Sequence, residues 1–586
     1  MNPIHHLKAF NMKQLRIFFG LAMIGLPGFV LANVIIVNTT ADENNNDGDC
    51  SLREAVRSAN EDTNIDNCNA GLGSDAIFIF ETGTINIGTG ILITDEVSVS
   101  GPGIDDLTLD SPLFNHFVVN MPDDTHDFEL SGMTLANGSN LAAGGSILIQ
   151  NGGDFLFEDL RFSNNRSTST NDAIGGVGGA IGVALPPGAE STMTIRRCLF
   201  ENNFARLRGG ALAVRGIPGF APLESLIIEE SRFSENSSDD DAGAIYANDV
   251  NEILIDRSEF TGNESDAGTG GAVLLDASAT SDLYSIRAST FVDNSAFNGG
   301  ALGLINGFGL IDNSTFTGNI SVSGLGNSII SRFNSVVGIA HSTFVANSSS
   351  RPVDDTIIAV TDGASVSMGH SIVWSEDAAS EPECSVVNGD GTFTSQGYNI
   401  DASGSCTSLA SDSPMTDPQL APLGDYGDDT DFLTLQTFLP LNGPAKNGGQ
   451  SGPCPGNLGA TLSVDQRGQP RPTSAGANRC DIGAVEVQSG SDPTGYPFTV
   501  TINSGNGTVI SSPGGIDCPG DCIGQFLQDS VVTLTAVPAP GFAFGGWSDA
   551  CSGTNPTCQF TITAAGSATA NFVESSDEIF SDRFEN

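Results

Sequence analysis

The chain has 586 residues, of which 70 are acidic and only 22 are basic, and its net charge is −48. So acidic a surface argues against nucleic acid or anionic lipid as a partner, because both would be repelled. Only four of the six histidines, His116, His126, His341 and His370, lie after residue 32, and no Cys-x-x-Cys pair is present, which argues against a zinc site.

Residues 1–32 are expected to be an export signal. Lys13 and Arg16 precede an apolar stretch, residues 17–31, and small residues suited to cleavage end at Ala32. The stretch is short and close to the terminus, which favours a removed signal over a permanent span, so we expect no transmembrane segment in the mature chain. Three of the 22 basic residues and none of the 70 acidic ones precede residue 33, so the mature net charge is −51.

Residues 33–75 are predicted to form an N-terminal cap. Ser51 and Glu54 have the spacing of a helix capping box. One apolar helical face follows, made of Leu52, Ala55, Val56 and Ala59. Such a short helix can close the open end of a stack of β-coils. Residues 50–55 read Cys-Ser-Leu-Arg-Glu-Ala, which resembles the signature of the CSLREA N-terminal domain of secreted bacterial β-helix proteins. The resemblance implies a class of protein, the secreted β-helix proteins, and a location outside the cell, but it implies no mechanism.

The same stretch has a second interpretation, a calcium loop. Glu43, Asn45, Asp47 and Glu54 have the spacing of oxygen ligands in such a loop. The first position carries Glu in place of Asp, and Glu54 also belongs to the hexamer. Ordinary solvated acidic side chains are the alternative. Calcium is therefore an optional ligand in this interpretation, and no cofactor is required.

Residues 76–380 are predicted to form a right-handed parallel β-helix, which makes the fold class all-β. A Phe stands three positions before an Asn seven times, at intervals of 25 to 38 residues, and this repetition indicates a solenoid. Stacked coils are expected to place Phe on Phe and Asn on Asn. The predicted ladder consists of Phe162, Asn165, Phe200, Asn203, Phe233, Asn236, Phe260, Asn263, Phe291, Asn294, Phe316, Asn319, Phe344 and Asn347.

Small-residue steps such as Gly210-Ala211 and Gly243-Ala244 separate most of these pairs. The combination is similar to the repeat of chlamydial polymorphic outer-membrane proteins, and the predicted solenoid resembles that of pectate lyases and bacterial adhesins. The resemblance covers roughly residues 128–374. It implies a pectin-lyase-like fold, which hosts many functions.

Ten of the 11 cysteines fall into local groups, which in an exported chain predicts disulfides. The groups are Cys50/Cys68, Cys384/Cys406, Cys454/Cys480, Cys518/Cys522 and Cys551/Cys558. Within the last four cysteines, crossed pairing is as compatible with the spacing as sequential pairing. Cys198 is left over and is predicted to be a buried thiol on a strand.

Residues 381–487 are predicted to close the far end of the β-helix as a loop-rich cap with two disulfides. The motifs Gly397-Tyr398-Asn399-Ile400 and Asp465-Gln466-Arg467-Gly468, followed by residues 480–486, resemble the choice-of-anchor Q module. That name refers to the varied C-terminal anchors found beside the module, and it implies no catalytic activity.

A linker, residues 488–496, leads to a small β domain, residues 497–573. Alternating strands and Gly545-Gly546-Trp547 resemble the divergent B-repeat of internalin-type surface proteins, which implies a spacer or interaction module. Residues 574–586 form a tail without a Leu-Pro-x-Thr-Gly sorting motif.

Catalytic candidates are few. No lysine lies between residues 32 and 446, which excludes a lysine base on the β-helix. Arg257 and Arg287 are candidate bases, although both stand just before a repeat Phe, where a structural role is the simpler interpretation. Asp239, Asp240 and Asp241 are candidate carboxylates for a hydrolase, with a solvated turn as the alternative.

The leading hypothesis is an exported protein, extracellular or on the surface of a bacterium. It would bind carbohydrate or a host or neighbouring surface protein without catalysis, as an adhesin does. A β-helix polysaccharide lyase or glycoside hydrolase is one alternative, and a structural cell-envelope filament is another.

Overall fold

The computed structural model describes residues 33–575 except 142, 169, 171–176, 186–190, 216–222, 249, 278–280, 350–355, 376–381, 428–431, 442, 473–478, 489–494, 513–514 and 521. The predicted signal at residues 1–32 and residues 576–586 of the predicted tail lie outside the described residues.

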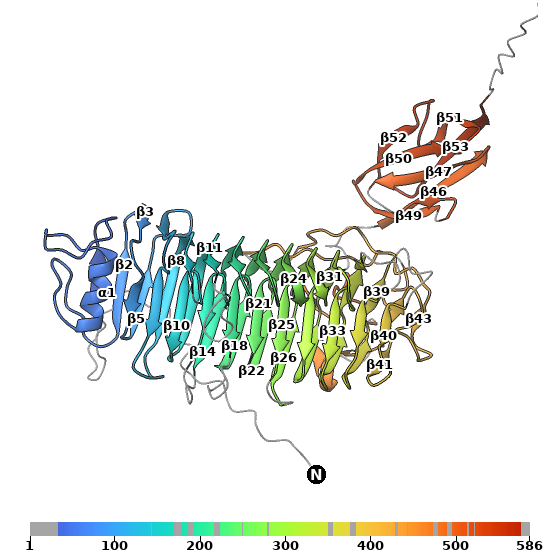
Figure 1. The fold of residues 1–586 in the computed structure, drawn as a ribbon. Coiled ribbons are helices and arrows are strands. Elements are labelled where there is room, and N and C mark those ends of the chain that lie inside the picture. Colours follow the sequence, from blue (N-terminus) through green and yellow to red (C-terminus); the bar gives the residue numbers. More distant parts are fainter. Residues whose placement is uncertain are drawn as a thin grey trace, which may run out of the picture.

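The fold is an elongated parallel β-helix followed by a small β domain (Figure 1). Three parallel sheets run along the β-helix, and they contain 24, 11 and 8 strands. The largest includes β1 (Asn33–Val37) and β43 (Ser413–Pro414), the second runs from β4 (Ile91–Ile93) to β40 (Cys384–Val386), and the third from β9 (Ser139–Asn140) to β36 (Ser348–Ser349). The predicted all-β class is confirmed.

One coil shows how the chain turns. β18 (Leu223–Glu229) and β19 (Arg232–Ser234) belong to the 24-stranded sheet, β20 (Ser237–Ser238) to the 8-stranded sheet and β21 (Ile245–Asn248) to the 11-stranded sheet. A bend separates β18 from β19, and its Glu230 has φ +48°. Strands of successive coils pair in register, so equivalent residues stack at the strand spacing of about 4.8 Å.

The repeat phenylalanines form a continuous aromatic stack inside the solenoid. Neighbouring rings from Phe162 to Phe344 lie 4.5–5.0 Å apart, centroid to centroid, and within 9° of parallel. All seven side chains are fully buried. Because in-register pairing sets the spacing, the rings stack face over face rather than edge to face.

The repeat asparagines form an amide ladder beside this stack. The Asn236 Nδ2 atom donates to Asn263 Oδ1 at 3.0 Å, and the Asn236 backbone N–H donates to the same oxygen at 3.1 Å. The Asn263 Nδ2 atom in turn donates to Asn294 Oδ1 and to the Phe233 carbonyl, each at 2.9 Å. Each side-chain amide thus forms hydrogen bonds with backbone N–H and C=O groups of a buried turn, where no neighbouring strand can pair with them.

A third ladder, of serine hydroxyls, was not predicted. At each bend the Ser Oγ accepts the backbone N–H of the equivalent residue in the preceding coil, at 3.1–3.3 Å. Its members are Ser231, Ser258, Ser289, Ser314, Ser342 and Ser371. Cys198 occupies the serine position of the coil before Ser231, and its Sγ faces the Arg196 carbonyl at 3.4 Å. The buried free thiol is therefore a member of this ladder.

The N-terminal end is closed by α1 (Leu52–Glu61), as the sequence predicts. Ser51 Oγ accepts from the Glu54 N–H, and the Glu54 carboxylate accepts from the Ser51 N–H, which completes the capping box. The four predicted apolar residues of the helix belong to the core of the solenoid. Figure 1 shows the helix lying across the first coils.

The small C-terminal domain consists of two four-stranded sheets with a core of its own. Its longest strands are β46 (Gly495–Ser504), β50 (Val531–Pro538), β51 (Phe542–Asp549) and β53 (Gly566–Glu574).

All five predicted disulfides form. The pairs outside the small domain are Cys50–Cys68, Cys384–Cys406 and Cys454–Cys480. Within the small domain the last four cysteines pair sequentially, as Cys518–Cys522 and Cys551–Cys558, so the crossed alternative is not the one that forms.

Candidate functional site

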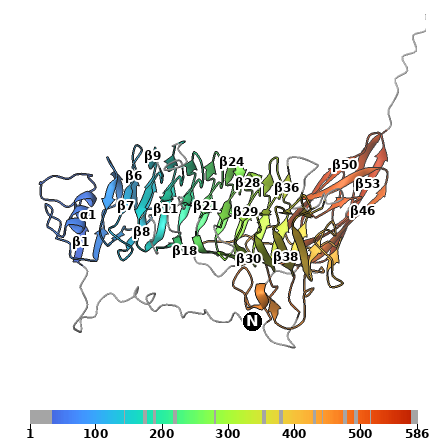
Figure 2. The same ribbon diagram turned by 60° about the horizontal axis from the view of Figure 1, so that its bottom comes forward.

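The region predicted as one C-terminal cap has two structural roles. Residues 382–418 complete the last coil through β40, β41 (Thr392–Gly397), β42 (Ile400–Asp401) and β43. Residues 432–487 are here called the strap. The strap instead folds back along the side of the 24-stranded sheet, where Figure 2 shows it in orange and brown. It lies there beside β30 (Phe308–Asp312) and β38 (Ser365–Gly369). Only the first part lies at the end of the stack, so a single cap over the end does not describe the whole region.

The two disulfides predicted for this cap therefore lie in different places. Cys384–Cys406 belongs to the end of the stack, because Cys384 begins β40. Cys454–Cys480 joins two segments of the strap, where the Gly449 N–H donates to the Cys480 carbonyl at 2.9 Å and the Gln450 N–H reaches His370 Nε2 at 3.3 Å. The predicted pairing of Cys454 with Cys480 is confirmed. The structure places this pair in the strap rather than in an end cap, because closeness in sequence suggests a partner and says nothing of the surface on which the pair packs.

Gln466 fastens the strap to two coils at once. Its Nε2 atom donates to Thr290 Oγ1 at 2.7 Å and to the Ser289 carbonyl at 3.3 Å. Its Oε1 accepts from Thr315 at 2.6 Å and from Thr437 of the strap at 3.0 Å. The buried amide thus uses both of its donors and both acceptor positions.

Further polar contacts extend the strap across later coils. The Ala484 N–H donates to Thr343 Oγ1, and Asn457 Nδ2 donates to Asp312 Oδ1 at 3.0 Å. Arg471 is fully buried, donates to Glu486 at 3.0 Å and reaches Asn313 Oδ1 of a coil at 3.2 Å. The contacts with the coils join residues more than 100 positions apart, so the strap is a tertiary feature rather than another coil.

Histidines lie beneath the strap. The rings of His341 and His370 stack at 4.8 Å, and His370 stacks on Tyr398 at the same distance. Burial lowers the pKa of His370 to about 4, with the nearby Arg471 adding to the effect. Burial and the same arginine also hold the pKa of His341 well below its usual value. Both imidazoles are therefore neutral near neutral pH.

The described residues of the strap do not reach the half of the same sheet from Glu158 to Arg287, and we call its outward charged residues the open strip. Its ion pairs run from coil to coil. They are Arg196–Glu158, Arg197–Glu158, Arg197–Asp159, Arg161–Glu201, Arg232–Glu259, Arg257–Glu230 and Arg287–Asp256. Their arginine side chains are 29–52% exposed, whereas Thr290 and Thr315 under the strap are fully buried.

The residue types along the sheet change where the strap begins. Glu259, next to the Ser258 of its bend, pairs in register with Thr290, and Thr290 pairs with Thr315. The bend position itself changes from charged residues to Ala288, Asn313, His341 and His370. This change from charged to neutral residues at about residue 288 is a sequence signal for the covered half, and the sequence analysis did not use it.

The structure does not gather the predicted catalytic residues in one place. Asp239, Asp240 and Asp241 follow β20 at the edge of the 8-stranded sheet, where Asp239 pairs with Arg206 at 3.0 Å and Asp241 with Arg208 at 3.2 Å. Arg257 and Arg287 belong to the open strip on the 24-stranded sheet. All five residues take part in ion pairs or other polar contacts within the protein.

The calcium candidates converge only in part. Ligand atoms of Glu43, Asp47 and Asp49 lie within 4.8 Å of one another, and so do those of Asp49, Glu54 and Asp66. Burial, with Asp47 and Asp49 adding to the effect, raises the pKa of Glu43. Asn45 directs its Nδ2 at Glu43 Oε2, so it offers a donor there, and Glu54 accepts the N–H groups of Ser51 and Asn45 as the helix cap. Glu43 and Asp47 thus belong to one group of carboxylates and Glu54 to another, and Asp49, which is common to both, and Asp66 are the members that sequence spacing missed.

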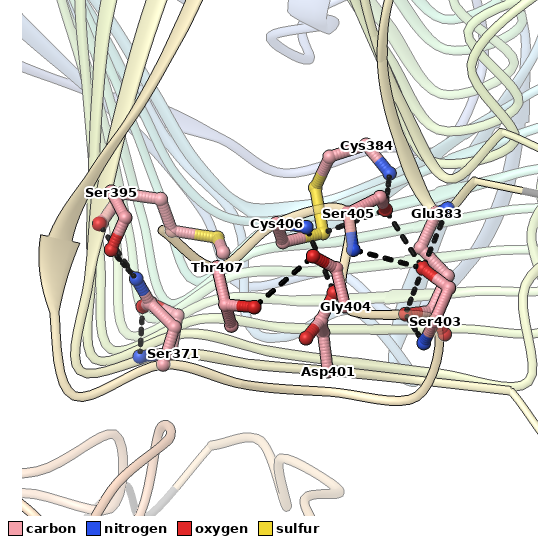
Figure 3. Close-up of a disulfide and its surroundings, with 12 residues drawn as sticks. Ser371, Glu383, Cys384, Ser395, Asp401, Ser403, Gly404, Ser405, Cys406 and Thr407 are labelled. Carbon is pink, nitrogen blue, oxygen red and sulfur yellow. Dashed lines mark hydrogen bonds between the residues drawn. A yellow bond between two sulfur atoms is a disulfide. The ribbon is translucent and has the colours of Figure 1, made fainter. Parts of the chain in front are cut away.

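A second group of carboxylates lies beside the Cys384–Cys406 disulfide (Figure 3). The Glu383 carboxylate accepts the N–H groups of Ser375, Ala402 and Ser403, and Asp401 accepts the Cys406 N–H. Burial raises the pKa of Glu383 to about 7, although these N–H groups oppose the shift. This group fastens the last turn of the solenoid to the segment around the disulfide.

Comparisons with known proteins assign the small domain but not the whole chain. Residues 498–576 match the family described as "Divergent InlB B-repeat domain". Over 184 residues the chain is 29% identical to "Metabotropic glutamate receptor-like protein R" of Dictyostelium discoideum. That match covers 31% of this chain and 10% of the other protein, so the chain spans about a tenth of the length of the curated relative it matches.

Among solved structures, the chain is similar to a mannuronic acid specific polysaccharide family 6 lyase from human gut microbiota. The TM-score is 0.28 at 12% identity, and the match covers 58% of this chain and 86% of the lyase chain. A likeness at this level assigns no activity. No helix in the described part of the chain has the length and apolar character of a membrane span.

Proposed function

We propose that this protein is exported and binds a polysaccharide along the open strip without cleaving it. The observation that carries the proposal is the division of one sheet into a covered half lined by threonines and an exposed half lined by paired charges. Exposed guanidinium groups present donors along this face, and the more exposed carboxylates of Asp159 and Glu201 present acceptors beside them, so sugar hydroxyls can use both.

The electrostatics of the strip favour a neutral ligand. In the ion pairs named above six arginines face six carboxylates, and the outward side chains of Glu229 and Glu252 on the same sheet add negative charge on a chain with a net charge of −48. A polyuronate would meet repulsion from the rest of the molecule. A neutral glycan would not, and the coil-to-coil spacing of about 4.8 Å gives it regularly repeated contacts.

The distribution of perturbed carboxyl groups favours binding over catalysis. A general acid works best with a pKa near the working pH, and burial raises the pKa of Asp312 to about 6 and that of Glu486 to about 7. Asp312 lies under the strap, Glu486 is a buried residue of the strap itself, and Glu383 lies at the end of the solenoid. The carboxyl groups whose pKa burial raises to about 6 or 7 are thus separated from the exposed face.

The terminal regions fit an extracellular role in this proposal. Five disulfides suit an oxidising compartment, and the B-repeat domain acts as a stalk or second binding module on a bacterial surface. The proposal also treats residues 33–75 as a CSLREA-like cap and residues 381–487 as a choice-of-anchor Q-like region of an exported protein.

A glycan array combined with an assay for released reducing or unsaturated ends tests the proposal. We expect binding without product, and we expect the charge-neutral double variant Arg232→Ala/Glu259→Ala to weaken it. The matched control is Arg206→Ala/Asp239→Ala, which removes an exposed ion pair from the 8-stranded side. Product release would establish an enzyme, self-association without glycan binding would establish a filament, and binding only to proteins would establish a protein adhesin.

A further inference from the structure

A cleft of about 340 Å³ lies between α1 and the loops around β4 at the N-terminal end, and it belongs to none of the features described above. The cleft is about half open to solvent, so it fits a ligand the size of a single ring and does not enclose it. Its base is apolar, because Val56 and Ile91 line it and are almost fully buried. At its rim Leu92 is 48% exposed, which adds an accessible apolar surface.

The polar side of the cleft has one fixed and one adaptable arginine. Arg53 is fixed, because it binds Asp42 through two bonds at 2.8 and 2.9 Å and the Thr89 carbonyl through a third. Arg57 pairs with Glu61 one helical turn later at 2.8 Å, and both side chains are almost half exposed. An exposed pair of this kind contributes little to stability, so its hydrogen-bonding groups can be shared with a ligand at small cost.

The cleft is also held open by the structure around it. Asn60 donates to the Leu92 carbonyl at 2.7 Å and accepts the Thr94 N–H at 2.9 Å, which fixes the distance between the helix and β4. The capping box and the Cys50–Cys68 disulfide fix the start of the helix. A pre-formed cavity binds without the cost of ordering its walls.

We propose that this cleft binds a single neutral sugar residue, such as the end of a glycan chain. A sugar has one face of C–H groups, which fits Leu92 and the apolar base, and vicinal hydroxyls, which fit the adjacent guanidinium and carboxylate of Arg57 and Glu61. The negative net charge disfavours an acidic sugar. The inference shares its ligand class with the proposed function but uses a different surface.

Saturation-transfer NMR of the full chain with glucose, galactose, mannose, N-acetylglucosamine and the matching uronic acids tests the inference. We expect a neutral sugar to give signals and the double variant Arg57→Ala/Glu61→Ala to weaken its affinity about tenfold, since bonds to charged groups contribute that much. The control variant is Arg206→Ala/Asp239→Ala, which should leave these signals unchanged, and the open-strip variant Arg232→Ala/Glu259→Ala shows separately whether any of the signal comes from the strip.

The outcomes separate this site from the proposed function. Loss of the signals in the open-strip variant alone would refute the cleft and support the strip. Absence of signals from every neutral sugar, or stronger binding of the uronic acids, would also overturn the inference. A Leu92→Ser variant gives a second check, because it removes the apolar contact and leaves every hydrogen bond of the cleft in place.

Discussion

Replacing Asn263 by Ala should destabilise the solenoid far more than replacing an exposed asparagine nearby. The Asn263 side chain takes part in four buried hydrogen bonds, two from Asn236 to its Oδ1 and one each from its Nδ2 to Phe233 and Asn294. At about 0.5–1.5 kcal/mol for each bond, the loss is about 2–6 kcal/mol. The Asn236 backbone N–H also loses its acceptor inside a dry turn.

The matched control is Asn251→Ala, since Asn251 is exposed and its amide reaches only Glu224 at 3.2 Å. That variant should change the free energy of unfolding by no more than about 0.5 kcal/mol. The chain has two tryptophans, Trp374 at the end of the solenoid and Trp547 in the small domain. Urea unfolding is therefore followed by fluorescence in a Trp547→Phe background, so that the signal reports only on the solenoid.

Hydrogen exchange at the Asn236 amide provides a local measurement of the same effect. In a solenoid each coil contacts mainly its neighbours, so we expect the faster exchange in Asn263→Ala to centre on the adjacent coils. If Asn263→Ala and Asn251→Ala unfold at the same urea concentration with unchanged exchange at Asn236, the amide ladder does not stabilise the fold as argued.

Four other predictions follow from the strap, the serine ladder, the buried acids and the acidic loop. Gln466→Ala should speed proteolysis of the strap while the coils stay folded, and equal cleavage rates in variant and parent would contradict its anchoring role. The free energy of unfolding of Cys198→Ser, measured in urea, should stay within about 1 kcal/mol of the parent value, because serine holds the same position in six other coils. Cys198→Val should lose more stability than Cys198→Ser. The folded-state pKa of Glu383 is raised to about 7, so this group binds its proton more tightly in the folded than in the unfolded chain, and its contribution to stability is lost as pH rises from about 4 to 7. Relative to Glu383→Gln, the parent should therefore lose about 3 kcal/mol between pH 4 and pH 8, and a constant difference would exclude the shift. Calcium binding at the acidic loop beside α1 should raise the melting temperature and a chelator should reverse the rise, whereas an unchanged temperature in both would remove the calcium hypothesis.

Much of the fold could be predicted because repetition multiplies a weak local signal. Phe260 or Asn263 alone indicates little, but the same pair at seven positions specifies in-register coils, and their stacking follows from that register. The capping box at Ser51 could be predicted for a different reason, because it depends on residues only three positions apart. The serine ladder repeats as regularly as the asparagines, yet serine is common enough for its repetition to be overlooked.

The candidate sites were less accessible to sequence reasoning. Spacing suggested Glu43, Asn45, Asp47 and Glu54 as one set, but a carboxylate that caps a helix already accepts backbone N–H groups. Arg257 and Arg287 were singled out as possible bases, and the structure places them in a row of ion pairs. The cleft beside α1 depends on contacts between the helix and β4, 30 or more residues apart, which no local pattern records.

The sequence by itself determined the coil, its ladders, the capping helix and the separate small domain, because each depends on local periodicity or on residues close together in the chain. It also suggested that Cys454 pairs with Cys480, but not that this pair lies in the strap. Only the tertiary structure decided which half of the 24-stranded sheet is exposed. The strap returns across more than 100 residues of chain to bind Thr290, Thr315 and Thr343, and such long-range contacts depend on where two completed surfaces meet. The exposed charges of the open strip follow from that packing, and so does the function proposed for them.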